Sequence, residues 1–193
     1  MARLLIVYGT TEGHTRKVAE RIAAAVRARG HVADVLDASA HPAAAGLDEY
    51  DGVVVAASLH YRRHQPSVVR FVRENLYALQ RLPTALFSVS LSAARQDPRH
   101  CAAARKCVNK FLDLTGWRAD RTYLVAGALA YSRYGFLKRR VMRWISWREG
   151  GDTDTSRDYE YTDWEKLRGD TRDYLLEVAR FAANIDASSP SPA

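Results

Sequence analysis

The sequence predicts an α/β fold in which helices cover both faces of a doubly wound, parallel β-sheet. Three observations predict it. Short apolar runs rich in β-branched residues recur along the chain, a polar loop follows each run, and apolar residues at helical spacing follow most loops. The repetition of strand, loop and helix with short connections is typical of βαβ units, which require a parallel sheet.

The first strand and its helix show this pattern most clearly. An apolar run over 4–7 ends at Gly9, a polar loop follows over 10–15, and an apolar stripe over 18–26 ends near Gly30, a residue that commonly stops a helix. Strands are then predicted over 31–36, 53–57, 84–89 and 123–128, and helices are predicted to begin at Pro66, near His100 and at Trp164.

Length and composition favour one domain without a membrane span. The 193 residues can bury a substantial core, and we expect a single domain over 1–186 with an insertion over 131–155 and a disordered tail over 187–193. No run of 18 apolar residues occurs, so the chain is predicted to be cytosolic. Cys101 and Cys107 fall on different faces of a helix, so we expect them to remain reduced. The net charge of +7 favours anionic partners.

The loop after the first strand, TTEGHT over 10–15, is predicted to bind a phosphate. Amides at the start of the following helix, its dipole and three threonine hydroxyls all favour an anion there. The glycine spacing fits neither a dinucleotide fingerprint nor a P-loop. The loop resembles the phosphate loop of flavodoxins, which holds FMN, and an ordinary helix cap is the alternative. Its candidate residues are Thr10, Thr11, Glu12, Gly13, His14 and Thr15.

In a flavodoxin-like order, 2-1-3-4-5, a flavin lies where the first and third of five strands are neighbours. Tyr61 is a candidate stacking surface or a core or rim aromatic, and we expect His60 and His64 to be solvated. No metal-ligand spacing occurs. The polar loop over 150–155 either closes over a ligand or only connects elements. Candidate contacts to the cofactor are Ser58, Leu59, His60, Tyr61, Ser88, Val89, Ser90, Leu91, Ser92, Gly127, Ala128, Leu129, Gly151, Asp152, Thr153 and Asp154.

The insertion over 131–155 is basic and amphipathic. One predicted helical stripe is apolar and contains Trp144, whereas Arg139 and Arg143 point elsewhere. This pattern favours a helix at an anionic membrane surface, or equally one that packs on its own domain or on a second subunit of a homo-oligomer. Nucleic acid is a weaker candidate, because no recognition motif accompanies the charge. Between 133 and 148 the basic residues are Arg133, Lys138, Arg139, Arg140, Arg143 and Arg148.

Several blocks together resemble the bacterial quinone-dependent protoporphyrinogen oxidases, a flavodoxin-like family. These blocks are TTEGHT, ASLHYRRH over 57–64, FSVSLSAAR over 87–95, KCVNKFL with GWRADR, AGALAYSRY over 126–134, GGDTDT over 150–155 and YTDW over 161–164. The resemblance implies FMN, protoporphyrinogen IX as electron donor, menaquinone or ubiquinone as acceptor, a place in haem biosynthesis, and peripheral association with the inner face of the cell membrane. The stretch over 62–65 is more basic and less aromatic than expected of the family.

The leading hypothesis is therefore an FMN-dependent protoporphyrinogen oxidase. An electron-carrier flavodoxin is an alternative that the positive charge argues against, and a flavin-dependent quinone reductase is another. No side chain has the pattern of a catalytic acid or base. Candidate contacts to substrate or membrane, chosen from location and charge, are Arg62, Arg63, Arg133, Arg139, Arg140, Arg143 and Trp144.

Overall fold

The five predicted strands form a parallel sheet in the predicted order. The structure, a computed structural model, describes residues 1–40, 46–94, 97–129, 154 and 157–188. The strand order β2-β1-β3-β5-β6 is the predicted 2-1-3-4-5 once the short β4 is set aside. The bounds are β1 Arg3–Gly9, β2 Val32–Asp37, β3 Gly52–His60, β5 Thr84–Ser90 and β6 Arg121–Ala126.

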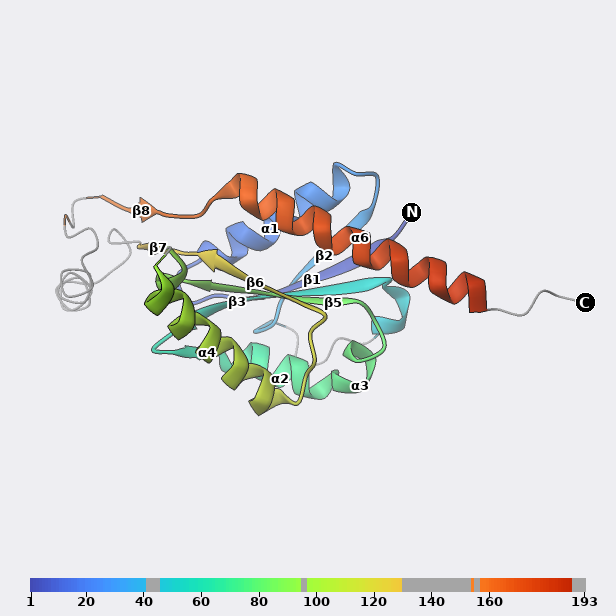
Figure 1. The fold of residues 1–193 in the computed structure, drawn as a ribbon, viewed down its shortest axis with the longest axis horizontal. Coiled ribbons are helices and arrows are strands. Elements are labelled where there is room, and N and C mark those ends of the chain that lie inside the picture. The colour runs from blue at the N-terminus through green and yellow to red at the C-terminus, as the bar shows by residue number, and fades with distance from the viewer. Residues whose placement is uncertain (41–45, 95–96, 130–153, 155–156, 189–193) are drawn as a thin grey trace, which may run out of the picture.

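Helices cover both faces of this sheet (Figure 1). α1 (His14–Arg27) and α6 (Trp164–Ser188) lie on one face, and α2 (Pro66–Glu74), α3 (Leu76–Leu79) and α4 (Pro98–Thr115) lie on the other. Each face has its own apolar core. The central strands β1, β3 and β5 are buried on both sides, which explains why they read as continuous apolar runs.

Close packing brings α2 against the end of β1. A Cβ atom added to Gly9 would lie 2.3 Å from Cγ2 of Val68 in α2, so only glycine fits at the last position of the strand. The chain therefore turns into the predicted phosphate loop directly beside the start of α2.

Two short antiparallel pairs were not predicted. β4 (Arg63–His64) pairs back onto the end of β3, and β7 (Ala128–Leu129) pairs with β8 (Tyr159–Glu160). Both pairs lie at the carboxyl edge of the parallel sheet, on the left of Figure 1. β4 adds to the parallel sheet, whereas β7 and β8 form a separate two-stranded sheet, and both pairs lie where a ligand is expected in this architecture.

The structure describes only part of the predicted insertion. Within the described residues, no helix is both long enough and apolar enough to cross a membrane. The candidate residues Arg133, Arg139, Arg140, Arg143, Trp144, Gly151, Asp152 and Thr153 lie outside the described residues.

Candidate functional site

The candidate site lies at the carboxyl ends of β1, β3, β5 and β6, where parallel strands deliver their following loops to one edge. The turn after β1 supplies the predicted phosphate loop, and it is shaped by one glycine and one hydroxyl. Gly13 has a left-handed backbone with φ of 88°, and its N–H donates to Oγ1 of Thr10 at 2.9 Å. Because Thr10 accepts this bond, its own hydroxyl proton stays available for a ligand.

Thr15 supplies the observation that tests whether FMN fits. Its side chain is 1% exposed at the first turn of α1, and Oγ1 has no hydrogen-bond partner among the described atoms. A buried hydroxyl without a partner costs about 1–3 kcal/mol. A phosphate at the helix start would accept its proton, beside the amides that the first turn leaves without intrahelical partners. The loop therefore fits the phosphate end of FMN.

His14 is held by a network that reaches across the fold. The Thr162 hydroxyl donates to the Ala126 carbonyl at 2.6 Å, so it can only accept from His14 Nε2, which lies 2.7 Å away. This bond fixes the Nε2–H tautomer. Burial lowers the pKa of His14, which keeps the ring neutral at pH 7. Lys17 Nζ, 2.6 Å from Glu160, adds an ion pair between α1 and β8. The His14 side chain thus holds the loop in position, and only the backbone of His14 is left to contact a ligand.

The loop after β3 is a two-residue hairpin turn with a strained backbone. Its central residues, Tyr61 and Arg62, have φ of 48° and 62°, values that fit a type I′ turn but are costly for residues with a Cβ. Tyr61 is 77% exposed, and its ring meets the His60 ring edge-on at a centroid distance of 4.6 Å. Core packing of Tyr61 is therefore excluded, whereas stacking on a ligand and a place at the rim both stay predictions. Strain of this kind concentrates at functional sites.

The prediction that His64 is solvated is wrong. β4 returns the chain under the turn, so His64 is only 7% exposed, its Nε2 lies 3.0 Å from Ser88 Oγ, and its ring packs on Phe111 at 4.7 Å. Burial lowers its pKa to about 4. His60, by contrast, is half-buried near the turn.

The remaining loops are tied together by side chains. The Gln65 amide donates to Thr11 Oγ1 at 3.3 Å and also to Ser58 Oγ, which joins the loops after β1 and β3. Ser88 is fully buried in the strand between β3 and β6, and its hydroxyl lies against His64, so the structure does not support its side chain as a cofactor contact. Ser90 Oγ accepts the Ala93 amide at 3.2 Å and shapes the turn that contains Leu91 and Ser92.

The loop after β6 closes against the one after β5. The Gly127 amide donates to the Ser90 carbonyl at 3.0 Å, and a Cβ on Gly127 would lie 3.3 Å from the Ser90 carbonyl carbon. The Gly127 carbonyl accepts from Tyr161, and buried Leu129 packs against Leu91. The structure therefore brings these predicted residues together. Asp154 lies farther along the chain, 3.6 Å from Arg157.

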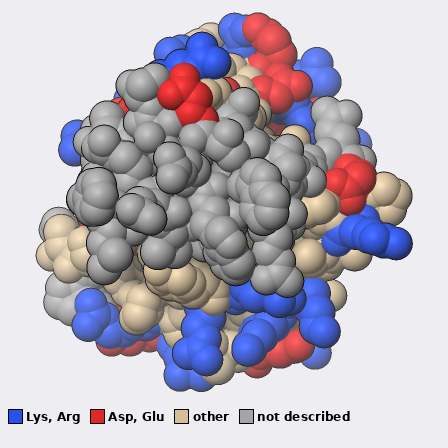
Figure 2. All heavy atoms as spheres, turned by 90° about the vertical axis from the view of Figure 1, so that its left-hand side faces the viewer, with Lys and Arg blue, Asp and Glu red and all other residues tan. Residues whose placement is uncertain are grey.

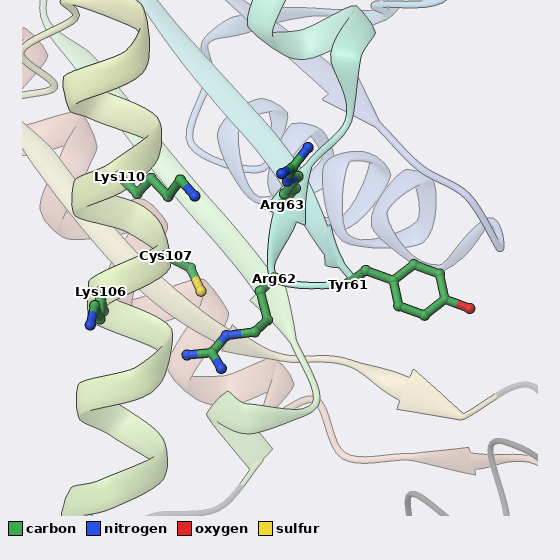
Figure 3. A pocket seen from close by; sticks show the side chains of 6 residues that line it. All are labelled: Tyr61, Arg62, Arg63, Lys106, Cys107 and Lys110. Atoms are coloured by element: carbon green, nitrogen blue, oxygen red, sulfur yellow. The ribbon is translucent and has the colours of Figure 1, made fainter.

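Thr162, Glu160 and Lys17 had no role predicted from the sequence. Gln65 was likewise not predicted to hold the loops together. The only signal for Thr162 was its place in the YTDW block, since its partners are distant in sequence. Among the described residues, no group of three or more His, Cys, Asp or Glu could hold a metal ion. Arg62 and Arg63 line a pocket with α4 beside the hairpin (Figure 3).

Comparison with known proteins agrees with this geometry. A flavodoxin domain family matches residues 5–156. Protoporphyrinogen IX dehydrogenase [quinone] of Escherichia coli K12 is 34% identical over 172 residues, covering 89% of this chain and 93% of the relative. A relative of the same name from Leishmania major is 31% identical over 176 residues, covering 89% of this chain and 74% of the relative.

Solved structures share the fold at low sequence identity. Oxidised flavodoxin 1 of Bacillus cereus has a TM-score of 0.53 at 17% identity, covering 91% of this chain and 98% of its own. A short-chain flavodoxin associated with a bacterial microcompartment has a TM-score of 0.55 at 13% identity, covering 92% of this chain and 99% of its own. The chain belongs to the flavodoxin-like family of quinone-dependent protoporphyrinogen IX dehydrogenases and is an oxidoreductase with FMN as cofactor.

Proposed function

We propose that the chain oxidises protoporphyrinogen IX to protoporphyrin IX and passes the electrons to a membrane quinone, menaquinone or ubiquinone, as a step of haem biosynthesis. The observation that carries the proposal is the match to two relatives of this name across nearly the whole chain, combined with a loop set that fits FMN. The substrate loses hydrogen from bridging carbons and ring nitrogens in two-electron steps. Bound FMN supplies the capacity to accept such equivalents and to release them singly or in pairs.

The chain's own residues bind the cofactor phosphate and position the cofactor ring. Thr10, Thr15 and the amides at the start of α1 would hold the phosphate, and the His14–Thr162 bond keeps that loop in place. The exposed Tyr61 ring would flank the cofactor ring from the hairpin, and the turn that begins at Ser90 would flank it from β5. Because the pKa values of His14 and His64 are both lowered, both rings are neutral at pH 7, and neither is expected to act as a general acid.

Charge supports an anionic substrate and an anionic surface. Arg62, Arg63, Arg133 and Arg139 are proposed to pair with the two propionates, as guanidinium groups match carboxylates well. The basic insertion, with Arg140, Arg143 and Trp144, is proposed to hold the protein at the inner face of the cell membrane, where the quinone is dissolved.

An anaerobic assay tests the reaction. FMN-loaded protein is mixed with protoporphyrinogen IX and a water-soluble quinone, and porphyrin fluorescence is followed against FMN-only and quinone-only controls. The proposal expects fluorescence that depends on both protein and quinone. If bound flavin stays oxidised in the presence of the porphyrinogen, the oxidase function is refuted, and reduction by NAD(P)H instead would favour a quinone reductase.

Membrane association is tested separately. Reversing Arg139, Arg140 and Arg143 to glutamate should move the protein from the vesicle pellet to the supernatant when it is sedimented with anionic vesicles. Reversal of Arg70, Arg73 and Arg105, which lie on α2 and α4, is the control with the same change of charge. Unchanged sedimentation of the first variant would refute the proposal that the insertion binds the membrane.

A further inference from the structure

A pocket between the β3–β4 hairpin and α4 gathers positive charge beside the candidate FMN site. It encloses about 310 Å³ and is lined by Tyr61, Arg62, Arg63, Lys106, Cys107 and Lys110. Two cations come from the hairpin and two from α4 (Figure 3). Seen from the carboxyl edge of the sheet, Lys and Arg gather along the lower side, which is the side that α2 and α4 cover (Figure 2).

Within the part of the chain that the structure describes, the four cations have no partner of opposite charge. No hydrogen bond or ion pair joins Arg62, Arg63, Lys106 or Lys110 to another described residue, and all four are exposed. Three cations elsewhere in the chain, Arg3, Arg16 and Lys17, each pair with a carboxylate. Lys106 and Lys110 are also four residues apart on one helix, where like charges repel. The four exposed cations are therefore available to an anion, and a bound anion would relieve the repulsion between the two lysines.

The hairpin is fixed where it faces α4. The buried His64 ring packs on Phe111, the α4 residue that follows Lys110, with ring centroids 4.7 Å apart. The left-handed turn then sends its two side chains apart: Arg62 points toward α4, whereas the Tyr61 ring, at the rim of the pocket, points away from α4 (Figure 3). The same turn thus presents an aromatic ring on one side and a cation on the other.

We propose that Lys106 and Lys110 of α4, together with Arg62 and Arg63, form the site that binds the carboxylate arms of the substrate. This inference rests on the proposed function and adds two α4 residues that set specificity. A pocket of about 310 Å³ is at the small end for a whole ligand, so it suits the acidic arms rather than the macrocycle. Arg offers two parallel hydrogen bonds to a carboxylate, and Lys adds an adaptable point charge. Four cations can therefore serve two carboxylates.

Binding of the product porphyrin tests the site without relying on turnover. The probes are protoporphyrin IX and its dimethyl ester, titrated by fluorescence into the FMN-loaded full-length protein. We expect the wild type to bind the diacid about tenfold more tightly than the ester, and Lys106→Gln/Lys110→Gln to remove most of this preference. Arg70→Gln/Arg105→Gln changes the charge equally on α2 and α4, outside the pocket, and should keep the preference.

The proposal is overturned if the double lysine variant keeps the wild-type preference for the diacid. If that variant also loses sedimentation with anionic vesicles, the pocket is assigned to lipid headgroups instead. This result is distinct from failure of the proposed function, which is a wild-type protein that does not oxidise protoporphyrinogen. Unchanged FMN content and thermal unfolding of the variant show that it is folded.

Discussion

The burial of His64 predicts a specific dependence of stability on pH. The ring is 7% exposed between Ser88 and Phe111, and burial lowers its pKa to about 4 from the usual 6.5. Below about pH 6.5 the unfolded chain binds a proton that the folded chain does not. The stability contributed by the neutral ring is therefore complete above this pH, and it is lost as the pH falls toward 4.

The magnitude follows from the two pKa values. By proton linkage, the loss relative to about pH 8 is about 0.8 kcal/mol at about pH 6, about 2 kcal/mol at about pH 5 and about 3 kcal/mol at about pH 4. Such a loss is a large part of the stability of an ordinary domain, which is about 5–15 kcal/mol.

His64→Gln isolates this contribution, because Gln can still donate to Ser88 Oγ but does not titrate. The free energy of unfolding is measured for both proteins by urea titration, followed by far-UV circular dichroism, between about pH 8 and about pH 4. Other titrating groups cancel in the difference between the two. We expect the free energy of unfolding of the wild type, minus that of the variant, to fall by about 2 kcal/mol between about pH 8 and about pH 5. A difference that stays constant with pH would refute the assignment of a buried neutral histidine.

Three further predictions concern the loops at the carboxyl edge. Thr15→Val should weaken FMN binding about tenfold, measured by flavin fluorescence, yet leave the apoprotein equally or more stable, because it removes a buried hydroxyl without a partner. Gly9→Ala should lower stability by about 1–3 kcal/mol, measured by thermal unfolding, since its Cβ would overlap Val68; an unchanged Tm would contradict this close contact. Arg62→Gly should raise the free energy of unfolding by about 1 kcal/mol by relieving the left-handed backbone, and a loss of stability in urea titration would show that the turn is not strained.

The parallel sheet was predictable because its signals are local and repeated. The runs at 4–7, 53–57 and 84–89 are apolar on both faces of a strand, and their order follows from the family resemblance. The hairpin was not predictable, since Tyr61–Arg62 lacks the Asn-Gly or Asp-Gly signal of a type I′ turn. Without that turn, the polar run HYRRH reads as an exposed loop, and His64 was wrongly placed in water.

In the site too, features that depend on neighbouring residues were predictable, whereas contacts between distant residues were not. The threonines of the phosphate loop lie within one strand–loop–helix unit, so their spacing alone indicated an anion. The bonds that hold this loop come from far away, because Thr162 is 148 residues from His14 and Gln65 is 54 residues from Thr11. Lys106 and Lys110 read as ordinary exposed positions of an amphipathic helix until the fold places them opposite the hairpin.

The β7–β8 pair fixes the point of the fold at which the chain can vary in length. Ala128 pairs with Glu160 and Leu129 with Tyr159, so the two ends of the 29 residues over 130–158 are pinned together at the rim of the sheet. The entropy of closing a loop depends only on the logarithm of its length, and doubling or halving it changes the free energy by about 0.6 kcal/mol. Segments of very different length can therefore be accommodated between these two strands at little cost in loop-closure free energy, while the parallel sheet keeps its stability.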